Sequence, residues 1–156
     1  MNKKGFTLVE LLATITILGI IMMVAVPNVV GIVKRNKDKT YIEDAKKLVT
    51  LAEYKAKTLN NLSISTGQCA VMTMSYLGDD EFENAPNNGE YDKDKSFVKI
   101  ELVNKEYKYS VSLVEKIGTN KYRGINSIDS VKLYEDDAIG NIKNEYGSVP
   151  ACTYKY

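Results

Sequence analysis

The sequence contains no histidine and no tryptophan, and only two of its 156 residues are cysteine. The absence of histidine excludes His-based catalytic triads, His general bases and His metal ligands. Two cysteines are too few for a closed structural zinc site, and they do not form a Cys-x-x-Cys pair. We also find no phosphate-binding glycine loop and no activated nucleophile. The sequence therefore predicts no enzyme, no cofactor and no metal-ligating set.

The charge balance is close to neutral. There are 21 basic and 20 acidic residues, which give a net charge of +1. Removal of Lys3 and Lys4 would leave 19 basic against 20 acidic side chains, a net charge of −1. Strong nonspecific binding of nucleic acid needs an excess of positive charge, so the composition does not indicate it.

Long apolar runs are confined to one stretch, from Phe6 to Val33, in which Glu10 is the one charged side chain. As a helix, these 28 residues would extend about 42 Å, enough to cross a bilayer. The run is too long for the apolar region of a secretory signal peptide. Because it is apolar on all sides, it does not resemble a core helix of a soluble protein. A plain membrane anchor fits the length but leaves Glu10 unexplained.

The start of this run carries the most specific motif in the chain, which reads KKGFTLVELL from Lys3 to Leu12. It resembles the N-terminus of type IV prepilins and related pseudopilins. In that family a prepilin peptidase cuts on the cytoplasmic side after the glycine, and the new N-terminal residue is N-methylated. The resemblance implies that cleavage follows Gly5 and that Phe6 becomes the mature N-terminus.

The resemblance also gives Glu10 a role in assembly, because the family's acidic residue is the fifth after the cleavage site. A carboxylate that is costly in lipid is tolerated when it is paired. If the helices bundle with an axial offset, Glu10 can meet the free amine of Phe6 in a neighbouring subunit. The pair would then set the register, as a buried polar group does in a coiled coil. The alternative is that Glu10 is merely solvated at the headgroup level.

Pro27 interrupts the helical hydrogen bonding of the apolar run and is expected to kink it. Members of the family often have a proline here, where it allows the helix to bend or partly melt in the filament.

The two cysteines, Cys69 and Cys152, are 83 positions apart. In an exported domain we expect them to form one disulfide that closes a long loop. Many pilins similarly tie down their C-terminal region with a disulfide. The alternative is two free thiols, with one in a loose C-terminal tail.

An amphipathic pattern continues the helix beyond the apolar run, with apolar residues at three- and four-residue steps from Tyr41 to Leu59. Asn60-Asn61 is the predicted stop. The chain then divides into a prepilin leader at 1–5, a transmembrane or filament-core helix at 6–33, an amphipathic continuation at 34–59 and a globular domain at 60–156.

The globular part changes to a period of two after a connecting segment at 60–95. Alternation over 98–102 and 107–113 predicts an antiparallel hairpin. Further strand candidates follow at 121–125 and 131–134, whereas 68–77 fits a short strand or a helical turn. We expect an α+β, type IV pilin-like fold, with the long N-terminal helix packed on a small antiparallel β-sheet.

Two surface features have competing interpretations. The segment 79–94 has seven acidic residues and one lysine, but lacks the glycine of an EF-hand at the sixth position. A solvated acidic loop is expected, with a calcium site of another loop geometry as the alternative. The 11 tyrosines can form an adhesive surface or can be half-buried sheet residues.

We expect a structural subunit of a type IV pilus or pilus-like filament. Its partners would be copies of itself, other pilins, the prepilin peptidase and the pilus assembly machinery, with a host surface or DNA as further ligands. It would sit in the cytoplasmic membrane before assembly, with the C-terminal domain outside, and in a cell-surface pilus afterwards. Basic residues at 34–39 oppose this orientation by the positive-inside rule, but a cytoplasmic peptidase must reach Gly5. The alternatives are a pseudopilin of a type II secretion or competence DNA-uptake system, and a membrane-anchored binding domain.

Overall fold

A computed structural model describes residues 5–59, 62–78, 80, 82 and 84–156. The leader residues Lys3 and Lys4, the predicted helix stop at Asn60-Asn61, and the acidic residues Asp79, Glu81 and Glu83 lie outside the described residues. By its internal contacts the chain forms two compact units, Met1–Asn36 and Lys37–Tyr156.

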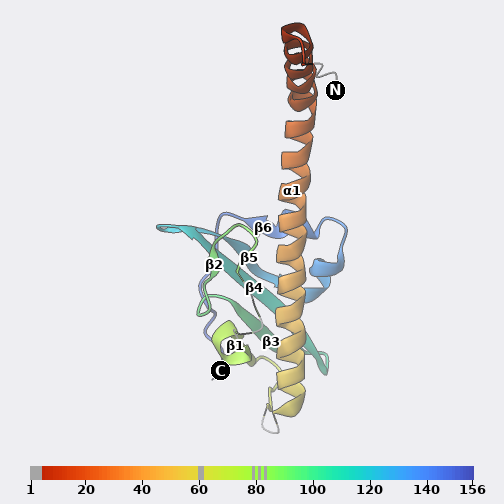
Figure 1. The fold of residues 1–156 in the computed structure, drawn as a ribbon. Coiled ribbons are helices and arrows are strands. Elements are labelled where there is room, and N and C mark those ends of the chain that lie inside the picture. Colours follow the sequence, from red (N-terminus) through yellow and green to blue (C-terminus); the bar gives the residue numbers. More distant parts are fainter. Residues whose placement is uncertain (1–4, 60–61, 79, 81, 83) are drawn as a thin grey trace. The chain divides into compact units, whose positions relative to one another are not determined.

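Helix α1 runs from Leu8 to Thr58, which confirms the predicted long N-terminal helix (Figure 1). In the first unit every described residue, from 5 to 36, is exposed. The side chains there are mostly Leu, Ile, Val and Met, so this part of α1 presents apolar surface on all sides. No described residue of the unit covers that surface.

The part of α1 in the second unit is amphipathic, as predicted. Its buried face consists of Asp38, Tyr41, Ile42, Ala45, Leu48, Val49 and Ala52. All of these residues except Asp38 share one core with buried strand residues that include Met72, Ile100 and Leu113. Ala56 and Leu59, which the pattern also placed on this face, are partly buried against the same core. The sheet therefore covers the apolar side of this half of the helix.

In the described part of the chain, seven strands form one sheet (Figure 1). Their order is β6-β5-β4-β3-β1-β7, and β2 pairs with β4 beside this path. The bounds are β1 Cys69–Thr73, β2 Glu90–Tyr91, β3 Phe97–Val103, β4 Glu106–Gly118, β5 Lys121–Asp129, β6 Ile142–Lys143 and β7 Tyr154–Lys155.

The predicted hairpin is present as β3 and β4, which pair from Phe97↔Ser112 to Val103↔Glu106. Its turn residues, Asn104 and Lys105, both have positive φ, at 54° and 68°. Two positive φ angles in a two-residue loop define the turn whose twist matches that of paired strands. The second hairpin joins β4 to β5, where Asn120 has a φ of 56°.

Two details differ from the sequence-based expectations. The sheet is mixed rather than fully antiparallel, because β7 pairs with β1 in parallel. The strand predicted at 131–134 is a 3-10 helix, η2, from Ser130 to Tyr134. The side chain of Asp129 accepts a hydrogen bond from the Val131 amide at 3.0 Å and so starts a helical turn.

The ambiguous segment at 68–77 contains both structures that were considered. Strand β1 is followed directly by a one-turn helix, α2, from Met74 to Leu77. A second 3-10 helix, η3, spans Ala138–Asn141.

Buried polar side chains lock these elements together. The Tyr41 hydroxyl donates to the Leu113 carbonyl at 2.7 Å, and Arg123 pairs with Asp38 at 2.6 Å, so both join α1 to the sheet. Glu115 on β4 is fully buried. It accepts hydrogen bonds from the Asn87 amide and side chain and from the Gly89 amide, at 2.9–3.3 Å, and thereby holds the turn before β2.

Candidate functional site

The N-terminal motif forms a capped helix start. The Thr7 amide and hydroxyl both donate to Glu10 Oε2, at 2.8 and 2.9 Å. The Glu10 amide donates in return to Thr7 Oγ1 at 3.3 Å. This is a reciprocal capping box, which satisfies backbone N–H groups that a helix start would otherwise leave without partners. Phe6, just before it, is 92% exposed.

Only one of the two oxygens of the Glu10 carboxylate takes part in this cap. Both donors go to Oε2, and among residues 5–59 and the other described parts of the chain no donor reaches Oε1. An ionised carboxylate has about four acceptor positions. One oxygen therefore stays available to a donor from another molecule.

The first part of α1 is long and apolar enough to cross a membrane by length and composition. Its few polar side chains bond within the helix: Thr14 donates to the Leu11 carbonyl at 2.8 Å, Thr16 to that of Leu12, and Asn28 to that of Val24 at 3.0 Å. In lipid a polar group must find its partner within the protein. These three side chains meet this demand without a second chain.

Pro27 lies inside α1, which continues through it to Thr58. Proline has no amide hydrogen to donate, so the backbone carbonyl four residues earlier, that of Met23, loses its helical partner. The structure thus places Pro27 where a bend would fall within the apolar part, and the kink itself stays a prediction.

Cys69 and Cys152 form a disulfide, with their Cα atoms 5.0 Å apart. It joins the start of β1 to the segment before β7. Beyond it, the Tyr156 amide donates to Val71 O at 2.8 Å, and Thr73 N donates to Tyr156 O at 3.0 Å. The end of the chain is therefore an ordered edge of the sheet and not a loose tail.

The acidic segment gives no support to a metal site. Within the described ranges, no group of three or more His, Cys, Asp or Glu side chains is arranged to hold a metal ion. Asp92 instead pairs with Lys95 at 3.2 Å, and the buried turn on Glu115 fixes the middle of the segment.

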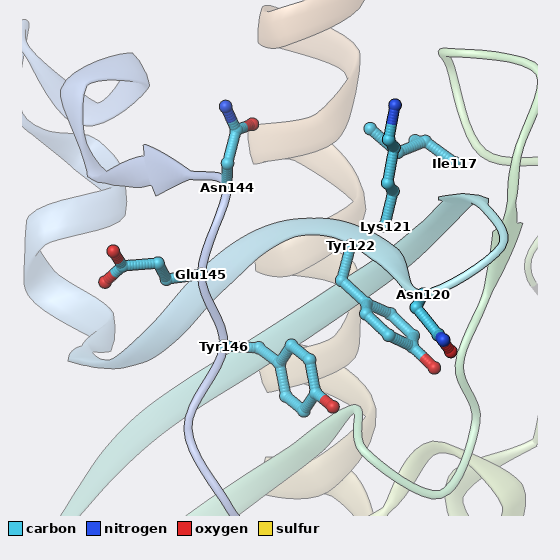
Figure 2. A pocket seen from close by; sticks show the side chains of 7 residues that line it. All are labelled: Ile117, Asn120, Lys121, Tyr122, Asn144, Glu145 and Tyr146. Atoms are coloured by element: carbon cyan, nitrogen blue, oxygen red, sulfur yellow. The ribbon is translucent and has the colours of Figure 1, made fainter.

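A hollow lies beside the β4–β5 hairpin (Figure 2). It has a volume of about 830 Å³ and is lined by Ile117, Asn120, Lys121, Tyr122, Asn144, Glu145 and Tyr146. A second hollow of about 490 Å³ shares Ile117 and Asn120 with it, and so adjoins it at the tip of the hairpin. We call the two together the hairpin groove.

Two tyrosines from different segments meet in this groove. Tyr122 on β5 and Tyr146, which follows β6, have ring centroids 4.6 Å apart in an edge-to-face arrangement (Figure 2). The Lys95 ammonium lies 4.3 and 4.7 Å from the two ring centroids and donates to the Tyr122 hydroxyl at 3.2 Å. The bonds to Tyr122, then to Tyr146 and Asp92, raise the pKa of Lys95 above its usual value. Lys95 is therefore charged at neutral pH, and it fixes both rings.

Comparison with known proteins bears on the N-terminal features. Residues 1–26 match the family model of the prokaryotic N-terminal methylation motif. The type IV wide pilus major component PilA4 of Thermus thermophilus is 34% identical over 76 residues, which cover 47% of this chain and 54% of that protein. Over these matched parts the chain is similar to type IV pilins. The matched region spans about half of the relative's length, and no solved structure matches the chain.

The N-terminal motif, the apolar helix and both cysteines were recognised from the sequence alone. The capping box was missed, although Thr-x-x-Glu before an apolar run is its usual signature. The Lys95 cluster and buried Glu115 were missed as well. Residues that are far apart in sequence build both features, and no local pattern marks them.

Proposed function

We propose that this chain is a structural subunit of a type IV pilus or pilus-like filament, held in the membrane by its N-terminal helix before it polymerises. The observation that carries the proposal is the first unit itself, in which all residues from 5 to 36 are exposed and most from 6 to 33 are apolar. Such a surface is stable only in lipid or against other apolar helices. Storage in a membrane followed by packing in a filament supplies each environment in turn.

Processing would occur between Gly5 and Phe6, followed by methylation of Phe6. The family-model match over residues 1–26 supports this site. The exposure of Phe6 and the start of α1 at Leu8 are compatible with it, because a peptidase needs an accessible, extended substrate. Residues 1–5 would be the leader, 6–33 the membrane and filament-core segment, 34–59 its amphipathic continuation and 60–156 the globular domain.

Glu10 would pair with the Phe6 amine of a neighbouring subunit. The capping box supports this role in two ways. It holds the carboxylate next to the cleavage site, and it leaves Oε1 for the incoming amine. Because the bond to Thr7 already offsets part of the desolvation cost, the membrane-stored subunit would tolerate Glu10 before a partner arrives.

Pro27 would let α1 adjust when it moves from lipid to the filament. The missing hydrogen bond at Met23 makes this turn the easiest one to bend. The second unit, which has its own core and disulfide, would keep its structure when the helix moves from lipid to the filament.

The test is the intact mass and N-terminal sequence of protein sheared from the cell surface. The proposal predicts a chain that starts at methylated Phe6 and is recovered in filaments. A processed chain found only in the cell envelope would favour the pseudopilin alternative, since pseudopilins share the N-terminal motif. An uncut chain that starts at Met1 would contradict the pilus role and favour a membrane-anchored binding domain.

A further inference from the structure

The hairpin groove has a composition suited to a ligand. Of the seven residues that line its larger part, two are tyrosines, two are asparagines, and Lys121 and Glu145 carry opposite charges. The smaller part adds Asn88, Thr119 and another opposite pair, Glu90 and Lys116. The groove therefore combines flat aromatic surface with amide, hydroxyl and carboxylate groups and has no net charge.

The polar side chains at the rim are available. Within the described part of the chain, the side chains of Asn120, Lys121, Asn144 and Glu145 have no hydrogen-bond, ion-pair or ring partner. All four are exposed. Figure 2 shows that Asn120 and Lys121 come from the β4–β5 turn and the start of β5, and Asn144 and Glu145 from the segment after β6; the Asn120 amide lies beside Tyr122, whereas the Glu145 carboxylate points away from both tyrosines.

The two tyrosine rings of the groove are held by contacts made within the chain. Lys95 contacts both tyrosine rings, bonds to the Tyr122 hydroxyl and pairs with Asp92. Tyr146 is still 36% exposed. Fixed rings with an open face offer contact area at little cost in conformational entropy, which favours binding.

The position of the groove is also set by the backbone. The pairing of β4 with β5 shifts between Lys116 and Gly118, which makes Ile117 an extra residue on β4. Such a bulge bends the strand and redirects its side chains. It brings Ile117 into the lining of both hollows.

We propose that the hairpin groove binds a neutral oligosaccharide. A pyranose ring presents C–H groups on its faces and hydroxyls at its edge, which match a tyrosine face with the Asn120 amide beside it (Figure 2). A polyanion such as DNA or a sulfated glycan is disfavoured, because each basic side chain that lines the groove is matched by an acidic one. A lipid is disfavoured because most of the lining residues are polar. This inference goes beyond the proposed filament role and does not depend on it.

The test is binding of the full-length protein to an array of neutral and acidic oligosaccharides, with single-stranded DNA and heparin as polyanion probes. The protein is kept in a polyoxyethylene detergent, because sugar-headed detergents would compete. We expect retention on neutral oligosaccharides. Tyr146→Ala should raise the Kd for the best probe about threefold to tenfold, the range expected for loss of one aromatic contact. Asn144→Ala should weaken binding without touching the Lys95 cluster.

The matched control is Tyr76→Ala. Tyr76 is also 36% exposed, is paired with another ring, that of Tyr156, and has Lys55 over its face. Tyr76→Ala should leave the Kd unchanged. Three results would overturn the proposal: no retention on neutral oligosaccharides, equal retention by wild type and both groove variants, or preferential binding of heparin or DNA. Because the assay uses unassembled protein, a failure of filament formation would not affect its outcome.

Discussion

The two units of this chain differ in whether their apolar residues are buried within the chain. In the second unit the core is built from α1 and the sheet, and residues such as Tyr41, Leu48 and Ile100 are fully buried. In the first unit no described residue is buried, although its side chains are more apolar. The same driving force acts in both. The second unit satisfies it within the chain, whereas the first must satisfy it in lipid or against other subunits.

The comparison implies that changes in the first unit alter processing and assembly, while changes in the second alter folding stability. In the first unit we expect the largest effect from Gly5→Leu. This change should abolish cleavage of the leader, because the proposed peptidase recognises the residue before the cleavage site. Immunoblotting for the precursor and mature forms measures the effect. Gly19→Leu is the control, since Gly19 lies in the apolar helix with open space around it. A mature-sized Gly5→Leu product would contradict the assigned cleavage site.

In the second unit the largest loss should come from the disulfide. Replacing both Cys69 and Cys152 by Ser frees a loop that spans 83 positions. The chain-entropy model then gives a decrease of about 4.5 kcal/mol in the free energy of unfolding. Urea unfolding followed by tyrosine fluorescence would measure it, with the reduced wild-type protein for comparison. An unchanged unfolding midpoint would show that the link between β1 and β7 contributes little.

Glu115→Ala should have the next largest effect. It removes the acceptor for three N–H donors in a buried site, which we expect to cost about 2–3 kcal/mol. A larger residue at position 89 could not fill the space left by the lost carboxylate, because a Cβ on Gly89 would lie 2.4 Å from the Lys116 carbonyl. Glu106→Ala, an exposed change on the same strand, should be neutral in the same urea titration. Equal losses for the two variants would contradict a specific role for Glu115.

Alkaline pH should destabilise the second unit gradually. Burial raises the pKa of Tyr41 and Tyr91 above 10, and the hydrogen bond to Asp44 raises that of Tyr91 further. Below pH 10 both states keep these protons, so the stability contribution is fully present. Above pH 10 the unfolded chain releases them while the folded chain does not. Stability should therefore fall by about 1.4 kcal/mol per pH unit for each tyrosine.

Urea titrations at pH 9, 10 and 11 would test this dependence. Tyr91→Phe should reduce the slope above pH 10 by about 1.4 kcal/mol per pH unit, the contribution of one tyrosine, while Tyr41, Tyr109 and Lys95, whose pKa values are also raised, keep contributing. An identical slope for the variant would mean that Tyr91 does not retain its proton in the folded protein.

The sequence predicted the features that depend on local pattern or on a family motif. The apolar run, the amphipathic face from Tyr41 onward and the β3–β4 hairpin follow from periods of 3.6 and 2. It failed where long-range contacts decide the structure. The parallel pairing of β7 depends on Cys152 reaching Cys69, and the alternation at 131–134 was overridden by the cap from Asp129.

The candidate sites divide in the same way. Gly5, Phe6 and Glu10 were identified from ten consecutive residues. The hairpin groove was not, because Lys95, Tyr122 and Tyr146 come from three segments that only the folded sheet brings together. The composition shows that tyrosine is frequent, but it does not show how the tyrosines are arranged in the fold.

The central claim is that the first unit serves assembly whereas the second unit determines folding stability. Its most direct test is to measure assembly and folding in the same variant, Glu10→Ala. We predict normal membrane insertion and an unchanged urea midpoint for the globular unit, with few or no filaments when this variant is the sole subunit. Glu10→Gln, which keeps an acceptor oxygen but loses the charge, should give intermediate assembly. Normal filaments from Glu10→Ala alone would contradict the pairing role. A shifted urea midpoint would contradict the independence of the two units.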